Sequence, residues 1–325
     1  MKLNYPIKFT PILKERIWGG DKLAKLYGKK ESNKPIGESW EISTVPGNIS
    51  VVENGPLEGQ NLQDLIKTYK AELLGEEVYE KYGETFPLLV KFIEANTDLS
   101  VQLHPDNQLA KERHQSFGKE EMWYIMQTEK NSRLLFGFNK QLTKESYKAY
   151  VESGKLEEVL HQEKVKKGTV YYIPPGRVHA IGAGIVLAEI QQSSDITYRI
   201  YDWNRTDTEG KSRELHTDLA LDAIDFSNVD DYQTHYRVEK EMFRNILSAS
   251  YFSVKILKIT TKKQILTTSK DSFIIYMCVK GNGYINVELM QVPIKEGETI
   301  LIPAGLRKYS ISPERTMKLL YIKAK

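Results

Sequence analysis

The sequence predicts a mainly β protein made of two double-sheet β-rolls, with a few helical insertions. Short runs rich in tyrosine and β-branched residues, separated by Gly, Pro, Asn and Asp, outnumber the helical patterns. A weak internal repeat relates residues 165–176 to residues 294–305, and both copies end in a Pro-x-Gly turn. These two observations indicate two related β units of jelly-roll type, one after the other along the chain.

Helical patterns are few and lie between the strand-like runs. The clearest begins after Asn61 and places apolar side chains at near-helical spacing, at Leu62, Leu65, Ile66, Tyr69 and Leu73. Further helical stretches are expected over about 143–161, broken near Gly154, and over 218–225. We expect these segments to lie on the outside of the β core.

The repeat also suggests how the chain is divided. When the two copies are aligned on the turn, His179 falls opposite Lys308, so only the first copy keeps a histidine there. We therefore expect a metal-binding first domain over 1–236, with the helical insertions, and a second domain without metal over 237–325. The polar stretch 227–236 is the expected junction.

Four residues of metal-ligand type occur in three strand-like segments. Gln102 and His104 are two residues apart, so an extended strand points both to the same face. Glu121 begins a second β-prone run, and His179 follows a strand and a tight Ile-Pro-Pro-Gly turn. Two imidazoles, a carboxylate and an amide oxygen suit a borderline divalent ion, and zinc is the first expectation. Taken singly, His104 is more often a turn or capped core residue than a ligand, Glu121 can be a solvated strand residue like its neighbour Glu120, and His179 can be a loop residue.

Composition and charge exclude several classes of protein. The 325 residues carry a net charge of +3 that is dispersed along the chain, which argues against binding to nucleic acid or to an anionic membrane. No stretch approaches the roughly 20 apolar residues of a membrane span, and the N-terminus has no apolar signal region. The single cysteine, Cys278, cannot form an intramolecular disulfide, and we expect it to be buried. These features predict a cytoplasmic protein, and they carry no signal for an oligomeric state.

Several motifs resemble known families. The pattern Gly-x5-Pro-x-Gly-x2-His, which ends at His179, resembles the second motif of cupin barrels. The motifs that resemble those of short bacterial (type I) mannose-6-phosphate isomerases lie, in the expected order, at 11–20, 36–41, 86–92, 99–106, 118–125 and 173–203. The resemblance thus covers the chain from about Pro11 to Asp202, and the later repeat fits that family's second cupin unit.

This resemblance implies a zinc-dependent interconversion of mannose 6-phosphate and fructose 6-phosphate through an enediolate. It implies one zinc ion held by Gln102, His104, Glu121 and His179, and an active-site arginine at Arg199. It also places five residues around the sugar phosphate: Lys119, Glu189, Glu38, Lys91 and Ser100.

The roles of these residues are open to alternatives. Glu189 shares a strand face with apolar residues, so its carboxylate is either paired or raised in pKa, which suits a general base or a charge partner of Arg199. Arg199 suits an enediolate or a phosphate, but an ion pair with Asp195 or Asp202 is the plain alternative. Lys119 either neutralises phosphate, assists proton transfer during ring opening, or is a solvated loop residue.

Two other functions fit parts of the pattern. Two histidines and a carboxylate also describe the facial triad of non-haem iron oxygenases, although a fourth protein ligand at Gln102 leaves fewer open positions. A sugar-responsive binding module would keep the barrel without chemistry, but such a module would more plausibly lack Glu189, Arg199 or Lys119. Metal identity and turnover of a phosphorylated sugar separate these functions.

Overall fold

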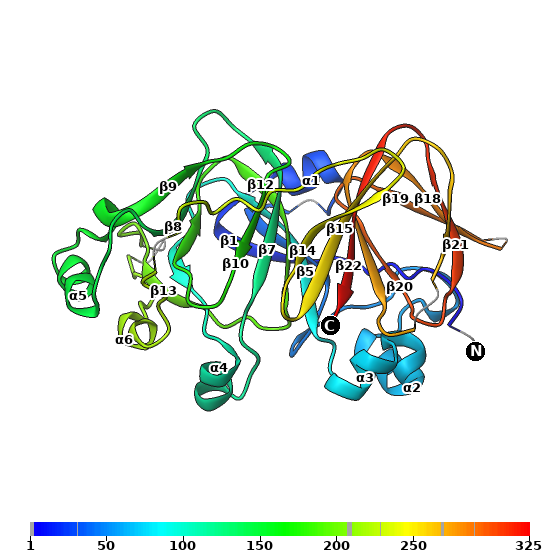
Figure 1. The fold of residues 1–325 in the computed structure, drawn as a ribbon, viewed down its shortest axis with the longest axis horizontal. Helices are drawn as coiled ribbons and strands as arrows, with labels where there is room; N and C mark the ends of the chain where they lie inside the picture. Colours follow the sequence, from blue (N-terminus) through cyan, green and yellow to red (C-terminus); the bar gives the residue numbers. More distant parts are fainter. Residues whose placement is uncertain (1–2, 31, 207–209, 228, 268–269, 289) are drawn as a thin grey trace.

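The computed structural model describes the whole chain except residues 1–2, 31, 207–209, 228, 268–269 and 289. Two β units lie side by side, each built from a larger and a smaller antiparallel sheet (Figure 1). The predicted fold class, two double-sheet jelly rolls with a few helices, is confirmed.

The first unit combines a six-stranded and a five-stranded sheet. The larger sheet has the strand order β1 (Ile12–Gly20), β2 (Ile36–Ile42), β5 (Leu88–Ala95), β12 (Ile185–Gln192), β7 (Glu121–Thr128) and β10 (Val170–Ile173). The smaller has the order β13 (Tyr198–Tyr201), β6 (Val101–Leu103), β11 (His179–Ile181), β8 (Arg133–Phe138) and β9 (Leu160–Lys164). A two-stranded ribbon, β3 (Thr44–Val45) and β4 (Asn48–Ile49), follows β2.

The second unit has the same plan with fewer strands. Its five-stranded sheet has the order β14 (Phe243–Ser248), β15 (Phe252–Ile259), β22 (Met317–Ala324), β17 (Ile274–Lys280) and β20 (Thr299–Ile302). Its four-stranded sheet has the order β16 (Lys263–Leu266), β21 (Lys308–Pro313), β18 (Asn282–Val287) and β19 (Met290–Lys295). The repeat predicted from the sequence is therefore real, because its two copies form β10 and β20 and the turns that follow them.

In the part of the chain that the structure describes, six α-helices lie outside the sheets, as expected: α1 (Lys22–Tyr27), α2 (Leu62–Leu74), α3 (Glu76–Tyr82), α4 (Asn107–His114), α5 (Lys144–Glu152) and α6 (Thr217–Leu221). Helix α2 has the predicted bounds, because the Asn61 side chain accepts a hydrogen bond from the Asp64 N–H and caps its first turn. The 143–161 pattern divides into α5 and a short 3-10 helix. Helices α1, α3 and α4 have no counterpart among the predicted segments.

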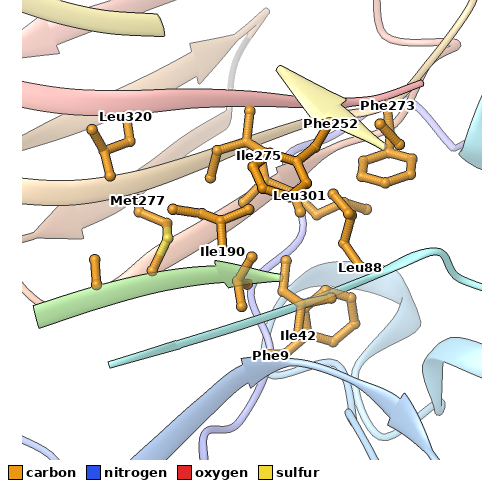
Figure 2. Packing of buried hydrophobic residues seen from close by; sticks show 14 of the residues in the cluster. Phe9, Ile42, Leu88, Ile190, Phe252, Phe273, Ile275, Met277, Leu301 and Leu320 are labelled. Carbon is orange, nitrogen blue, oxygen red and sulfur yellow. The ribbon is translucent and has the colours of Figure 1, made fainter. Parts of the chain in front are cut away.

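Strand alternation separates a hydrophobic cluster inside each unit from a large one between the units, and the first unit has two further clusters, around Tyr147 and around Trp40. In β12, Ile185 and Leu187 face the interior of the first unit, while Val186 and Ile190 face the second. Figure 2 shows this shared core, in which Ile190 lies close to side chains of both units. Phe86 and Phe273 stack across it with their ring centroids 4.7 Å apart. The buried Cys278 belongs to the interior of the second unit, as expected.

Segments of the first unit also contact the second. Ile7 pairs with Leu301, and α2 and α3 lie against the second unit, where the Ala304 N–H donates to the Leu73 carbonyl (Figure 1). The strands of the two sheet pairs are separated between Tyr201 and Phe243. A domain boundary at 236 stays a prediction, and residue 228 of the expected junction lies outside the described residues.

Within the described residues, no helix combines the length and the apolar character needed to cross a membrane.

Candidate metal centre and substrate cavity

The three predicted acidic and histidine ligands meet inside the first unit. His104 follows β6, Glu121 opens β7 and His179 opens β11, so two sheets contribute to one cluster. Their candidate ligand atoms all lie within 4.8 Å of one another, and each of the three residues is 1% exposed. Nε2 of His104 lies 3.2 Å from Glu121 Oε1, and Nε2 of His179 lies 3.9 Å from Glu121 Oε2.

The hydrogen bonds of the two histidines direct their other nitrogens to the cluster. His104 Nδ1 lies 2.9 Å from the Ile196 carbonyl, and His179 Nδ1 lies 2.8 Å from the Arg177 carbonyl. Carbonyl oxygens only accept, so each ring donates through Nδ1 and keeps a lone pair on Nε2. Among the described residues, both Nε2 atoms and Glu121 Oε2 are buried without a hydrogen-bond partner, while Glu121 Oε1 has the Lys119 ammonium, with Nζ at 2.8 Å. Buried polar atoms without partners are rare, and a metal ion would satisfy these three.

The pKa shifts match the protonation states that a metal needs. Burial, followed by the charge of Lys119, lowers the pKa of His104 to about 4, and burial also lowers the pKa of His179. For Glu121, burial alone would raise the pKa, but the charge of Lys119, with Nζ 2.8 Å from Oε1, and the neighbouring histidines lower it well below its usual range. The cluster therefore presents two neutral imidazoles and a carboxylate, which are the ligand forms for a divalent ion.

Gln102 lies beside this cluster. In β6 it pairs directly with His179 on one side and with Arg199 on the other. Its Oε1 lies 3.3 Å from the Ser100 hydroxyl, which donates to it. The amide oxygen is thus already oriented by Ser100, and its role as a fourth ligand stays a prediction.

A cavity of about 380 Å³ opens beside the cluster. Its lining includes Glu38, Lys91, Ser100, Gln102, Lys119, Glu189 and Arg199, so all ten predicted site residues lie either in the cluster or around this cavity. The lining carries five basic side chains against three acidic ones: Arg16, Lys91, Lys119, Arg199 and Arg213 against Glu38, Glu189 and Asp195. An excess of positive charge in a cavity of this size suits a small anionic ligand.

Ion pairs and hydrogen bonds connect a chain of charged side chains along the lining of the cavity. Lys91 Nζ lies 2.9 Å from Glu189 Oε2 and 3.9 Å from Glu38 Oε2. Arg16 Nε lies 2.8 Å from Glu38 Oε1, and Trp123 Nε1 donates to Glu189 Oε1 at 2.9 Å. Glu189 is therefore a paired carboxylate whose partner is Lys91, not Arg199.

This chain of charges stabilises the ionised form of Glu38. Burial alone would raise the pKa of Glu38, but the charges of Lys91 and Arg16 and a hydrogen bond from Trp40 Nε1 lower it to about 2. Burial alone would lower the pKa of Lys91, whereas the charge of Glu189 and then that of Glu38 raise it. Glu38 and Lys91 thus hold each other in their charged forms.

Among the described residues, Arg199 does not form the alternative ion pair with Asp202. Asp202 accepts hydrogen bonds from Arg205 and from Arg213, with Arg213 Nε and Nη2 at 2.7 and 2.6 Å. Arg199 instead donates from Nη1 to the Glu214 carbonyl at 2.8 Å. Burial, followed by the charge of Arg213, lowers the pKa of Arg199, which shows that this corner of the cavity is rich in positive charge.

Sequence reasoning missed several residues around the cavity. Arg16 and Arg213 line it, and so do Trp18 and Trp40, which also belong to buried hydrophobic clusters. Arg16 is on β1 at the edge of the larger sheet and alternates with Trp18, a strand pattern that offered a signal. Glu120 was expected to be solvated and is instead 2% exposed.

Comparison with known proteins agrees with this geometry. Residues 7–149 match the family described as phosphomannose isomerase type I, catalytic domain, and residues 243–322 match the mannose-6-phosphate isomerase cupin domain. The chain is 35% identical to the mannose-6-phosphate isomerase ManA of Bacillus subtilis, covering 94% of this chain and 95% of the relative. It is 32% identical to the mannose-6-phosphate isomerase of Streptococcus mutans, covering 94% of each.

Solved structures give the same result. A crystal structure of the mannose 6-phosphate isomerase from Bacillus subtilis superposes with a TM-score of 0.88 at 33% identity, covering 98% of this chain and 99% of the other. Sequence and fold agree along nearly the whole length of both proteins. The chain belongs to the type I mannose-6-phosphate isomerase family.

Proposed function

We propose that this protein is a zinc-dependent aldose–ketose isomerase that interconverts mannose 6-phosphate and fructose 6-phosphate through an enediolate. The observation that carries the proposal is the buried His104–Glu121–His179 cluster, whose converging ligand atoms lie beside a cavity with excess positive charge. The relatives named mannose-6-phosphate isomerase support the substrate. A cytoplasmic location stays a prediction from the sequence.

Zinc fits the donor set, because imidazole and carboxylate are its common protein ligands and Gln102 adds an amide oxygen. When bound, zinc acts as a Lewis acid that stabilises negative charge developing on the carbonyl and hydroxyl oxygens of the sugar. The carbonyls of Ile196 and Arg177 would hold the two histidine rings in the required orientation.

The cations of the cavity would bind and orient the sugar phosphate. The phosphate carries close to two negative charges at neutral pH, and the lining has an excess of two positive side chains. Arg213 is fixed in place by its two hydrogen bonds to Asp202, so it can face an anion without reorganising. Arg199 is next to Gln102 in the strand register, which supports a position near the reacting end of the sugar.

Glu189 is the candidate for moving the proton between the two carbons. The open-chain sugar loses a proton from the carbon beside the carbonyl, and the same proton returns to the neighbouring carbon. Lys91 Nζ lies 2.9 Å from Glu189 Oε2 and Trp123 Nε1 donates to Glu189 Oε1, so the carboxylate is held in one orientation, as a positioned base requires. Lys119, paired with Glu121, is placed to assist proton transfer during ring opening or to neutralise the phosphate.

A coupled assay on mannose 6-phosphate, before and after chelation with zinc add-back, tests the proposal. We expect turnover that the chelator abolishes and zinc restores. Zinc bound without turnover would instead indicate a sugar-binding module, and bound iron that supports oxidation would indicate an oxygenase.

A further inference from the structure

Glu120 lies between two residues of the proposed site but points away from it. Lys119 lines the cavity and pairs with Glu121, whereas Glu120, just before β7, contacts Tyr172 and the second unit instead. There it is 2% exposed, and the Tyr172 hydroxyl donates to its Oε2 at 3.1 Å. A buried carboxylate needs hydrogen-bond donors, and a single hydroxyl does not satisfy two oxygens.

The remaining donors come from the second β unit. The N–H groups of Ser250 and Tyr251 donate to Glu120 Oε1 at 3.0 and 3.4 Å. Both residues belong to the turn between β14 and β15. The carboxylate of Glu120 therefore ties the segment that carries Lys119 and Glu121 to the backbone of the unit that lacks the cluster.

Tyr251 makes a second connection to the same segment. Its hydroxyl accepts from Asn107 Nδ2 at 2.6 Å, and Asn107 Oδ1 accepts from the Gly118 N–H at 2.7 Å and from Gln192 Nε2 at 3.1 Å. Gln192 Oε1 in turn accepts from the Glu120 N–H at 3.0 Å. The main chain around Lys119 is thus held at Gly118 and at Glu120 by contacts that lead back to Tyr251.

We propose that the second unit acts as a positioning element for the metal centre, through the contacts of Glu120 and Tyr251. The inference rests on the proposed function, since it concerns the same cluster. Glu121 must keep its carboxylate within reach of both histidines, and Lys119 must stay beside it, so a small displacement of this segment disturbs every ligand distance. Fixing a peptide segment from outside restricts such displacement.

Three substitutions and one matched control test the inference. Glu120→Ala removes the acceptor, Glu120→Gln keeps an oxygen for the two N–H groups, and Tyr251→Phe removes only the hydroxyl that binds Asn107. Tyr236→Phe is the control, because it also loses a tyrosine hydroxyl, which bonds the Gly168 carbonyl and Tyr124, without touching the 118–121 segment. The readouts are the zinc dissociation constant by chelator competition, kcat and KM on mannose 6-phosphate, Tm, and amide hydrogen exchange of residues 118–122.

We expect Glu120→Ala to weaken zinc binding by about 10- to 100-fold and to lower kcat more than it raises KM. Tyr251→Phe should weaken zinc binding about three- to tenfold. Both should speed exchange of the Lys119 amide, which donates to the Pro105 carbonyl. The zinc dissociation constant and kcat of Glu120→Gln and Tyr236→Phe should stay within about threefold of the parent values, whatever their Tm.

The inference is overturned if Tyr251→Phe loses as much Tm as Tyr236→Phe but keeps the zinc affinity and the amide exchange of the parent. Glu120 would then be a purely structural residue. If Glu120→Ala does not fold, Tyr251→Phe against Tyr236→Phe decides. Amide exchange is measured without substrate or metal. It therefore tests the inference even if the parent protein shows no turnover, so failure of the inference can be told apart from failure of the proposed function.

Discussion

The two β units share a strand order and differ where the first unit carries its cluster. In the first unit β7 pairs with β10, and Glu121 lies opposite Ile173. In the second unit β17 pairs with β20 in the same way, and Ile274 lies opposite Ile302. One position in equivalent strands is thus a candidate metal-ligand carboxylate in one unit and an apolar core residue in the other.

The smaller sheets repeat this contrast. His179 opens β11 opposite Gln102, whereas Lys308 opens β21 opposite Leu266. Leu266 occupies the position of Gln102 in the second unit. It is 71% exposed, so it points to solvent. The alignment of His179 with Lys308 that the sequence suggested is confirmed by the strand register.

Each sheet of the first unit also has one strand that the second unit lacks within the described residues. These are the edge strands β1, which carries Arg16, and β13, which carries Arg199. The comparison teaches that a double-sheet roll becomes a candidate active site through a few inward substitutions plus added edge strands that supply cations.

The largest effect is expected when Glu121 is replaced by isoleucine, the residue at the equivalent position of the second unit. Glu121→Ile should abolish zinc binding and lower kcat/KM by about a thousandfold or more, because metal stabilisation of developing charge is worth several kcal/mol. Metal analysis and the coupled assay measure both losses. Ile274→Val, at the equivalent position, should leave zinc content and turnover unchanged; a similar loss there would contradict the division of roles.

The edge strand β13 provides the next test. Arg199→Ala should keep zinc and lower kcat by about 10²- to 10³-fold, the range for removing a donor to developing charge. His104→Ala, in contrast, should lower metal content and activity together. Retained turnover in Arg199→Ala would show that β13 contributes stability only.

Acid sensitivity separates the charged interior of the first unit from the apolar interior of the second. Folding lowers the pKa of Glu38 from 4.5 to about 2, so its contribution to stability is present above pH 4.5 and is lost as pH falls toward 2. About 2 kcal/mol of free energy of unfolding should disappear between pH 5 and pH 3. Urea denaturation at both pH values should show this drop in the parent protein and a smaller one in Glu38→Gln.

The smallest expected effects come from another pair of equivalent positions, Trp123 and Tyr276. Tyr276 bonds the Tyr309 hydroxyl at 2.9 Å inside the second unit, so Tyr276→Phe should cost about 1 kcal/mol of stability with kcat/KM unchanged. Trp123→Phe removes the bond to Glu189 and should lower kcat/KM by about tenfold for a similar loss of stability. Thermal denaturation and steady-state kinetics compare the two.

Much of the site was predictable because local pattern determines it. Strand alternation brings Gln102 to the same face as His104, and the Pro-x-Gly turn places His179, so spacing alone indicated a cluster. The assignment of zinc and of a role for each residue depended on the resemblance to a family, since each residue taken alone also fits other functions.

The missed features depend on contacts between distant segments. Arg213 reaches the cavity through a loop after β13, where no periodic pattern marks its direction. Glu120 looked solvated because its donors, Ser250 and Tyr251, are about 130 residues away in the sequence. Pairing of this kind follows from how the two units pack, which local propensity does not encode.

The order of strands in the second unit has a consequence for synthesis on the ribosome. β22, the strand nearest the C-terminus, lies in the middle of its sheet between β15 and β17, and Leu320 and Ile322 contribute to the core shared with the first unit. A nascent chain therefore cannot cover the apolar face of β5, β7 and β12 until translation reaches β22. Until β22 has been synthesised, part of this apolar face stays exposed and is open to chaperones that bind emerging chains.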